Sequence, residues 1–113
     1  DISWRTSTWD LRRMVLGGLV LNPVDTNERR RLGIGNDKLA LKVHYVGWFG
    51  KHGTAKKAGV QKGDILVDYE GNTANWTESQ VIAYGLKNIK VGQTIGLRFL
   101  RNSRTIDIKF RSQ

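Results

Sequence analysis

The sequence contains no cysteine, a single proline and only two histidines among its 113 residues. Without cysteine the chain can form neither a disulfide nor a thiolate metal site, and it has no cysteine nucleophile. The two histidines, His44 and His52, cannot hold a metal by themselves, and no cluster of acidic residues accompanies them in the sequence. We therefore expect no metal site and no cofactor.

Long apolar runs are also missing. The longest, from Met14 to Leu21, is far shorter than the roughly 18–20 residues that a membrane-spanning helix needs, so we expect no membrane insertion. No apolar signal region follows Asp1, and a start without methionine predicts a fragment of a longer protein. Residues 1–12 are expected to be a connector from that parent whose two tryptophans pack on the domain. A docking surface for other parts of the parent is the alternative.

What the chain has in excess is positive charge, with a net charge of +9. Such a balance attracts anions, including nucleic acid and acidic peptides. The lysines and arginines are dispersed, however, and the only dense run is Arg29–Arg31. Since no aromatic platform or groove-reading motif accompanies the charge, a nucleic-acid partner is disfavoured. The length suits one globular domain with a modest core.

The first third of the chain predicts a short strand and a helix. Leu19 to Leu21 are expected to form a strand that ends at Asn22-Pro23, because proline cannot donate to a β-ladder. Asp25, three residues before a glutamate, is a helix-capping signal. Arg29–Arg31 then occupy the last turn, where cations suit the helix dipole, and Gly33 follows as the terminating glycine. The arginine run is thus explained structurally rather than as a binding patch.

The middle of the chain alternates strands with helices. Residues 39–46 show the period-two pattern of a strand, with Leu39, Leu41, Val43 and Tyr45 on one face. Thr54 is expected to cap a one-turn helix over residues 55–58. Residues 64–69 predict a further strand, which turns at residues 70–72.

A longer helix and a hairpin complete the pattern. Thr77 and Gln80 form a capping box that opens a helix to about Lys87, and Ile82, Leu86 and Ile89 are expected to form its core face. Residues 94–100 and 105–110 alternate as a β-hairpin. The predicted fold is mainly β with two or three short helices, arranged as a partly open β-barrel or sandwich of five or six strands.

One segment carries a family resemblance. Residues 54–72, TAKKAGVQKGDILVDYEGN, resemble the signature S-x-A-x-x-A-G-[LIV]-x-x-G-D-x-[IL]-x-x-[VI]-[ND]-G of PDZ domains, with threonine for serine and Glu70 where Asn or Asp is usual. The final hairpin resembles the bacterial HtrA type, with Ser103 where that pattern prefers glycine. The resemblance covers residues 13–111, which we take as the PDZ domain. It implies a non-catalytic peptide-binding module and an extracytoplasmic or periplasmic location. Asp64, within the signature, is expected to bond nearby backbone amides rather than to catalyse.

PDZ domains hold a peptide carboxylate in a φ-G-φ loop (φ denoting a hydrophobic residue), and two segments fit that pattern. Leu32-Gly33-Ile34 matches the φ-G-φ pattern more closely residue by residue. Leu16-Gly17-Gly18, preceded by Arg13, fits the HtrA layout, in which a short strand and a helix follow the loop. We favour Leu16-Gly17-Gly18 as the carboxylate loop. It implies that the amides of Gly17, Gly18 and Leu19 hold the carboxylate, that Arg13 or its neighbour Arg12 attracts it, and that the strand containing Leu19 and Val20 pairs with the ligand.

The second wall of the groove is expected on the helix that begins near Thr77. Val81 and Gly85 are predicted to face the peptide, and an alignment shifted by two residues would substitute Ser79 and Ala83. The implied partner is a peptide or protein C-terminus with a hydrophobic terminal side chain, besides domains of the parent protein.

Three functions remain open from the sequence. A peptide-binding module is favoured; a structural or docking domain with a degenerate groove is the alternative; a basic anion or nucleic-acid binder is disfavoured. An enzyme is not expected, because no Gly-x-Ser-x-Gly stretch is present and neither histidine has a plausible acid and serine partner. Any catalysis, such as that of a serine protease, would belong to a parent domain.

Overall fold

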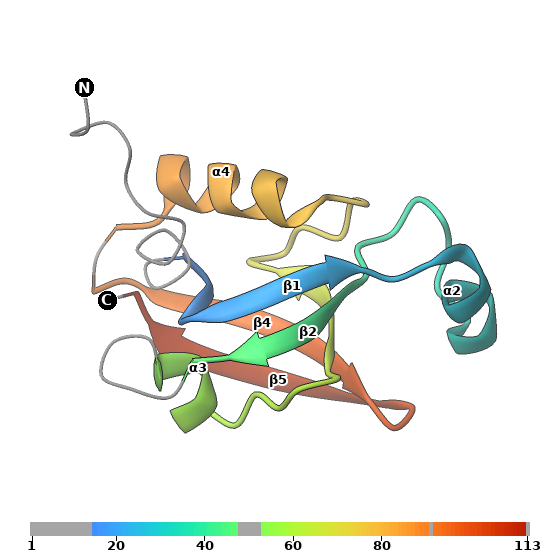
Figure 1. Ribbon diagram of the computed structural model, residues 1–113. Helices are drawn as coiled ribbons and strands as arrows, with labels where there is room; N and C mark the ends of the chain where they lie inside the picture. The colour runs from blue at the N-terminus through green and yellow to red at the C-terminus, as the bar shows by residue number, and fades with distance from the viewer. Residues whose placement is uncertain (1–14, 48–52, 91, 113) are drawn as a thin grey trace.

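The computed structural model describes residues 15–47, 53–90 and 92–112. A five-stranded antiparallel sheet forms its centre, and each strand pairs with the next one along the chain, in the order β1-β2-β3-β4-β5 (Figure 1). The strands are β1 (Leu19–Pro23), β2 (Leu41–Val46), β3 (Ile65–Tyr69), β4 (Thr94–Arg101) and β5 (Arg104–Arg111). The sheet is open, with β1 and β5 at its edges, which confirms the predicted mainly β, partly open fold and sets the strand number at five in the described part.

Three short helices with both ends in the described part of the chain accompany the sheet: α2 (Thr26–Leu32), α3 (Thr54–Lys57) and α4 (Glu78–Asn88). Figure 1 shows α4 lying along one side of the sheet beside β1, while α2 lies beyond the end of β1. Among the described residues, none of the helices has the length and apolar character needed to cross a bilayer.

The start and end signals of α2 are confirmed. The Asp25 carboxylate accepts a hydrogen bond from the Glu28 amide at 2.7 Å, and Gly33 ends the helix with a left-handed φ of 75°. Within the basic run, Arg30 and Arg31 are exposed, but Arg29 is only 6% exposed. The run is therefore not a continuous charged patch.

The buried Arg29 guanidinium joins three segments of the chain. Its Nε donates to the Val24 carbonyl at 3.2 Å, and its Nη1 donates to the carbonyls of Gly35 at 2.9 Å and Lys38 at 2.7 Å. Its Nη2 donates to Oδ1 of Asn75 at 2.7 Å. The planar, multi-donor guanidinium can serve all these acceptors together, so it holds α2 and two loops against the end of the sheet.

The predicted alternation of the second strand fails at its end. Leu41 and Val43 are buried as expected, but Tyr45 is 43% exposed. The cause is a β-bulge: Val20 pairs with Tyr45 while Leu21 pairs with Val43, so β2 contains one extra residue. The extra residue moves Tyr45 to the outer face.

Two of the departures from the family patterns, Glu70 and Ser103, fall in turns with a positive φ. Glu70 has a φ of 52°, and in the hairpin turn between β4 and β5 Asn102 and Ser103 have φ values of 51° and 65°. Two consecutive left-handed residues define the type I′ hairpin turn, in which Asn-Gly is the preferred pair. The preferences for Asn, Asp or glycine at these positions therefore come from backbone conformation.

Two predictions about helices are wrong. The cap of α3 is Gly53 and not Thr54, which is already the first helical residue. On α4 the capping box of Thr77 and Gln80 is confirmed, but Leu86 is 47% exposed instead of facing the core. The buried residues of α4 are Val81, Ile82 and Gly85. A hydrophobicity pattern does not identify Gly85 as an inward position, because glycine has no side chain to count.

Asp64 has the structural role expected of it. Its carboxylate accepts from the Gln61 amide at 2.9 Å and receives Nε and Nη2 of Arg101 at 2.7 and 2.6 Å. This bidentate pair fixes the turn before β3 to the end of β4.

Replacing Arg29 by lysine is expected to lower the free energy of unfolding by roughly 3 kcal/mol, because an ammonium cannot reach all of the carbonyl and amide oxygens that the guanidinium serves and leaves some of them buried without a partner. Chemical denaturation measures the change. Arg30→Lys, one position further on the exposed side of α2, is the matched control and should change the stability by less than about 0.5 kcal/mol. Equal effects of the two substitutions would contradict the role of Arg29.

Ser103→Gly is expected to stabilise the domain by about 1 kcal/mol, because glycine adopts the left-handed conformation without the strain of a Cβ. Thermal unfolding should show a higher midpoint. Asn102→Gly in the same turn should give a smaller gain, since asparagine tolerates this conformation better than serine. A lower midpoint for Ser103→Gly would show that the turn is not under conformational strain.

Candidate functional site

The free edge of β1 is the centre of the candidate site. The Gly18 carbonyl accepts from the Gly47 amide at 3.1 Å, on the side of β2, whereas the Leu21 amide donates away from β2, to Oε2 of Glu78 at 2.6 Å. Because backbone groups alternate sides along a strand, Leu19 and Leu21 direct their N–H and C=O groups toward the outer edge. Pro23, the next outward residue, has no N–H to offer.

The loop Leu16-Gly17-Gly18 leads directly into this edge. Gly17 and Gly18 have φ values of 64° and 93°, in the region that favours glycine. A Cβ on Gly17 would also lie 2.9 Å from the Ala55 nitrogen and 3.0 Å from Cε1 of Phe110. Gly17 is thus required both by its conformation and by close packing.

The conformation of Gly18 explains why no hydrophobic residue occupies the second φ position of the motif. The carbonyls of both glycines are held by hydrogen bonds: that of Gly17 accepts from the Ala55 amide at 3.1 Å, and that of Gly18 from the Gly47 amide. The loop conformation is therefore fixed from two sides.

Leu32-Gly33-Ile34, the other φ-G-φ segment, lies elsewhere. Gly33 terminates α2, and Leu32 and Ile34 pack against the small hydrophobic cluster of Val24, Ala40 and Ile65. The strand that follows is β2, which pairs with β1 on one side and with β3 on the other, so it offers no free edge.

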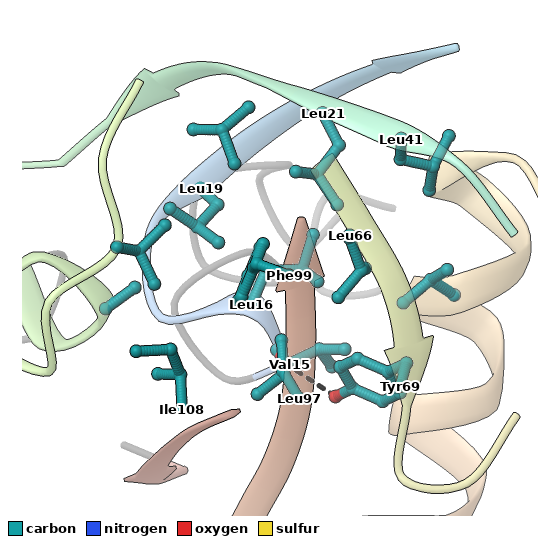
Figure 2. Close-up of a cluster of buried hydrophobic side chains, with 14 of the residues drawn as sticks. Val15, Leu16, Leu19, Leu21, Leu41, Leu66, Tyr69, Leu97, Phe99 and Ile108 are labelled. Atoms are coloured by element: carbon teal, nitrogen blue, oxygen red, sulfur yellow. Dashed lines mark hydrogen bonds between the residues drawn. The ribbon is translucent and has the colours of Figure 1, made fainter. Parts of the chain in front are cut away.

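Val15 fastens the loop to the rest of the domain. Its carbonyl accepts a hydrogen bond from the Tyr69 hydroxyl at 2.6 Å, in the buried interior (Figure 2). Burial raises the pKa of Tyr69 far above its ordinary value, so the hydroxyl remains protonated and able to donate. The Val15 side chain lies against α4 at Gly85, where a Cβ would come within 2.3 Å of Cγ1 of Val15.

The structure brings most of the predicted site residues together at this edge. Leu16, Leu19 and Val81 are 0% exposed and belong to the main hydrophobic core, Val20 is half-buried, and Gly85 contacts Val15. The side chains of Leu16 and Leu19 point into the core, so these two residues can reach a ligand only through their backbone. Arg13 and the connector of residues 1–12 lie outside the described residues. That these residues bind a peptide stays a prediction.

Sequence reasoning did not identify Glu78, whose carboxylate reaches from the first residue of α4 to β1. Its position after the capping Thr77 indicated only a favourable interaction with the helix dipole. The pairing with an amide 57 positions away depends on how α4 lies beside β1, which no local pattern encodes.

Residues 15–47, 53–90 and 92–112 contain no group of three histidine, aspartate or glutamate side chains placed to hold a metal. Asp64 is already paired with Arg101, and His44 is exposed on β2. What the edge of β1 offers is backbone N–H and C=O groups.

Comparisons with known proteins agree with this architecture. No family model matches the sequence, and no curated protein matches it. Among solved structures, a point variant of the HtrA-type protease AlgW in complex with a decapeptide superposes with a TM-score of 0.69 at 19% identity, over 84% of this chain and 27% of that one. AlgW without the substitution, also with a decapeptide, gives a TM-score of 0.62 at 19% identity, over 84% and 27%.

The PDZ domain of EpsC from Vibrio cholerae gives a TM-score of 0.56 at 16% identity, over 86% of this chain and 97% of that domain. Such identities establish likeness of fold. The chain has a PDZ fold, and it spans 27% of the AlgW chain.

Gly85→Ala is expected to destabilise the domain by about 1–2 kcal/mol, although alanine is the better helix former by about 1 kcal/mol, because the new methyl group would overlap the stiff Val15 side chain. Chemical denaturation measures the change. Combining it with Val15→Ala, which removes both γ carbons, should recover part of the loss relative to the sum of the single changes. If the effects of the two substitutions simply add, or if Gly85→Ala stabilises the domain, then Gly85 and Val15 are not in close contact.

Proposed function

We propose that this domain is a non-catalytic peptide-binding module, which captures a C-terminal or extended peptide segment by adding it as a strand to the outer edge of β1, between β1 and α4. The observation that carries the proposal is the pair of outward-facing residues Leu19 and Leu21 on an edge strand that lies beside a helix. Strand addition draws its affinity from main-chain hydrogen bonds and its specificity from pockets for alternate side chains.

The loop before β1 supports capture of a carboxylate. Leu16 ends a helical turn and Gly17 follows it in a left-handed conformation, a sequence of conformations that turns successive N–H groups toward one concave site suited to anions. In this proposal the amides of Gly17, Gly18 and Leu19 hold the terminal carboxylate and Arg13 adds electrostatic attraction. The family resemblance implies a hydrophobic terminal side chain in the ligand.

The relatives by fold give independent support. AlgW is an HtrA-type protease whose structures were solved with a decapeptide and with a tripeptide. If this chain has an equivalent place in its parent, any proteolysis resides in other domains and the location is extracytoplasmic. The net charge of +9 would speed association with acidic partners.

A docking domain with a degenerate groove is the second candidate, and two observations favour it. Val81 is fully buried and Gly85 lies against Val15, so the wall of α4 is already in contact with the domain's own core. Glu78 in addition occupies the Leu21 amide. A domain of this kind would bind no free peptide and would contact only other parts of its parent.

The decisive measurement compares two labelled peptides of one sequence, ending in a hydrophobic residue, with a free carboxylate or with a C-terminal amide. Fluorescence anisotropy should give a Kd roughly tenfold lower for the free acid, because the amide loses charge-assisted hydrogen bonds to the loop. Equal affinities would contradict capture of the carboxylate, and a lack of binding for every such peptide would favour the docking domain.

A pair of glycine substitutions locates the site. Gly18→Ala and Gly33→Ala each place a Cβ on a residue of positive φ, so both should lower the stability to a similar degree. Only Gly18→Ala should also weaken binding of the free acid. If Gly33→Ala weakens it as much, the loop before β1 is not the carboxylate site.

A further inference from the structure

The carboxylate of Glu78 lies on the backbone edge to which a peptide would add. Its Oε2 accepts the Leu21 amide proton at 2.6 Å, bridging the first residue of α4 and the middle of β1 in a half-buried position. A helix-opening glutamate ordinarily faces solvent or the amides of its own helix, so this contact with a strand on another element is not explained by helix capping.

The amide that Glu78 occupies is one of few available. Of the outward residues of β1, Pro23 has no N–H, which leaves Leu19 and Leu21 as the two donors that an added strand could use. The Leu19 amide is one of the three assigned above to the terminal carboxylate, so Leu21 is the donor that would pair with the body of the ligand. Glu78 thus occupies the N–H group that would pair with the ligand's backbone upstream of its C-terminal residue.

We infer that Glu78 is a resident competitor, which closes the edge of β1 and must leave the Leu21 amide before a peptide strand can pair there. This inference rests on the proposed function, since it assigns the regulation of the same site. Hydrogen bonds to an ionised carboxylate are stronger than those to a peptide carbonyl, so exchanging one for the other opposes binding. The benefit in the free protein is protection of an exposed strand edge from unselective pairing.

The displaced carboxylate also affects the choice of ligand. Once it has left Leu21, the Glu78 side chain remains beside the added strand, near the ligand residue that lies opposite Leu21. A basic residue at that place gains an ion pair, whereas an acidic one is repelled. The groove is therefore expected to reject an acidic residue at this place, although the net charge of +9 attracts acidic peptides in general.

The test uses Glu78→Ala, which removes the acceptor, and Glu78→Gln, which keeps a neutral acceptor of similar shape. Asp107→Ala is the control: it removes one negative charge from an exposed side chain on β5, at the opposite edge of the sheet. Thermal unfolding establishes that each variant is folded, and Glu78→Gln serves if Glu78→Ala does not fold. Two readouts follow, the Kd of the free-acid peptide and the hydrogen exchange of the Leu21 amide measured by NMR.

We expect Glu78→Ala to bind the free-acid peptide roughly tenfold more tightly than the unchanged protein, with Glu78→Gln between them, because the charge-assisted bond no longer has to be broken. In the absence of peptide the Leu21 amide should exchange faster in Glu78→Ala and at the original rate in Asp107→Ala. A peptide with glutamate opposite Leu21 should bind more weakly than its lysine counterpart in the unchanged protein, and this difference should shrink in Glu78→Ala.

The outcomes separate the two proposals. If the unchanged protein binds peptide and Glu78→Ala binds it equally or more weakly, the competitor role is overturned while the peptide-binding function stands. Binding that occurs only after Glu78 is replaced supports the competitor role and contradicts peptide capture by the unchanged protein. If no variant binds any peptide, the proposed function fails and the inference fails with it.

Discussion

The position of the candidate site depends on Val15, which is packed where three elements meet. Its side chain lies against α4 at Gly85, its carbonyl receives the Tyr69 hydroxyl from β3, and its chain continues directly into the loop that opens β1 (Figure 2). Because Val is stiff at χ1 and the Tyr69 bond is buried, neither contact can relax easily. The separation of β1 from α4 is therefore set by core packing and not by the loop itself.

The short separation between β1 and α4 limits how open the edge of β1 can be. A helix held against Val15 by a glycine brings its first turn within hydrogen-bonding distance of Leu21, and Glu78 is the residue at that point. The same packing that places α4 beside β1 thus delivers a carboxylate to the strand. An edge strand with free amides is an aggregation hazard, and a side chain that pairs with one of them offsets it at the expense of affinity for ligands.

Much of the framework could be predicted from the sequence because its signals are local. The Asp25 cap, the Gly33 terminator, the Thr77 capping box and the β4–β5 hairpin all depend on residues within a few positions of each other. The predictions that are wrong depend on contacts between residues far apart in the sequence. The exposure of Tyr45 follows from a bulge against β1, which belongs to the pairing of two strands rather than to either one.

In the candidate site, too, local signals are readable from the sequence and tertiary contacts are not. The helix signals at Asp25 and Gly33 indicate the order of the elements, and the loop before β1 does precede an edge strand. Its role as the carboxylate site stays a prediction. The burial of Arg29 and the reach of Glu78 were not foreseen. Both side chains bond to backbone atoms that tertiary packing brings near, and a charged residue in a sequence ordinarily indicates solvent exposure.

The family signature and the candidate site are physically coupled, even though the signature residues do no chemistry. Ala55, within the signature, donates its amide to the Gly17 carbonyl and is small enough for the glycine to approach within contact distance. A larger side chain at position 55 would push the loop outward, and a side chain on Gly17 would do the same from the other side. The conformation of the loop is thus fixed by the contact between two small residues. Conservation of shape at such a contact, rather than of any reactive group, is what a backbone-directed recognition site requires.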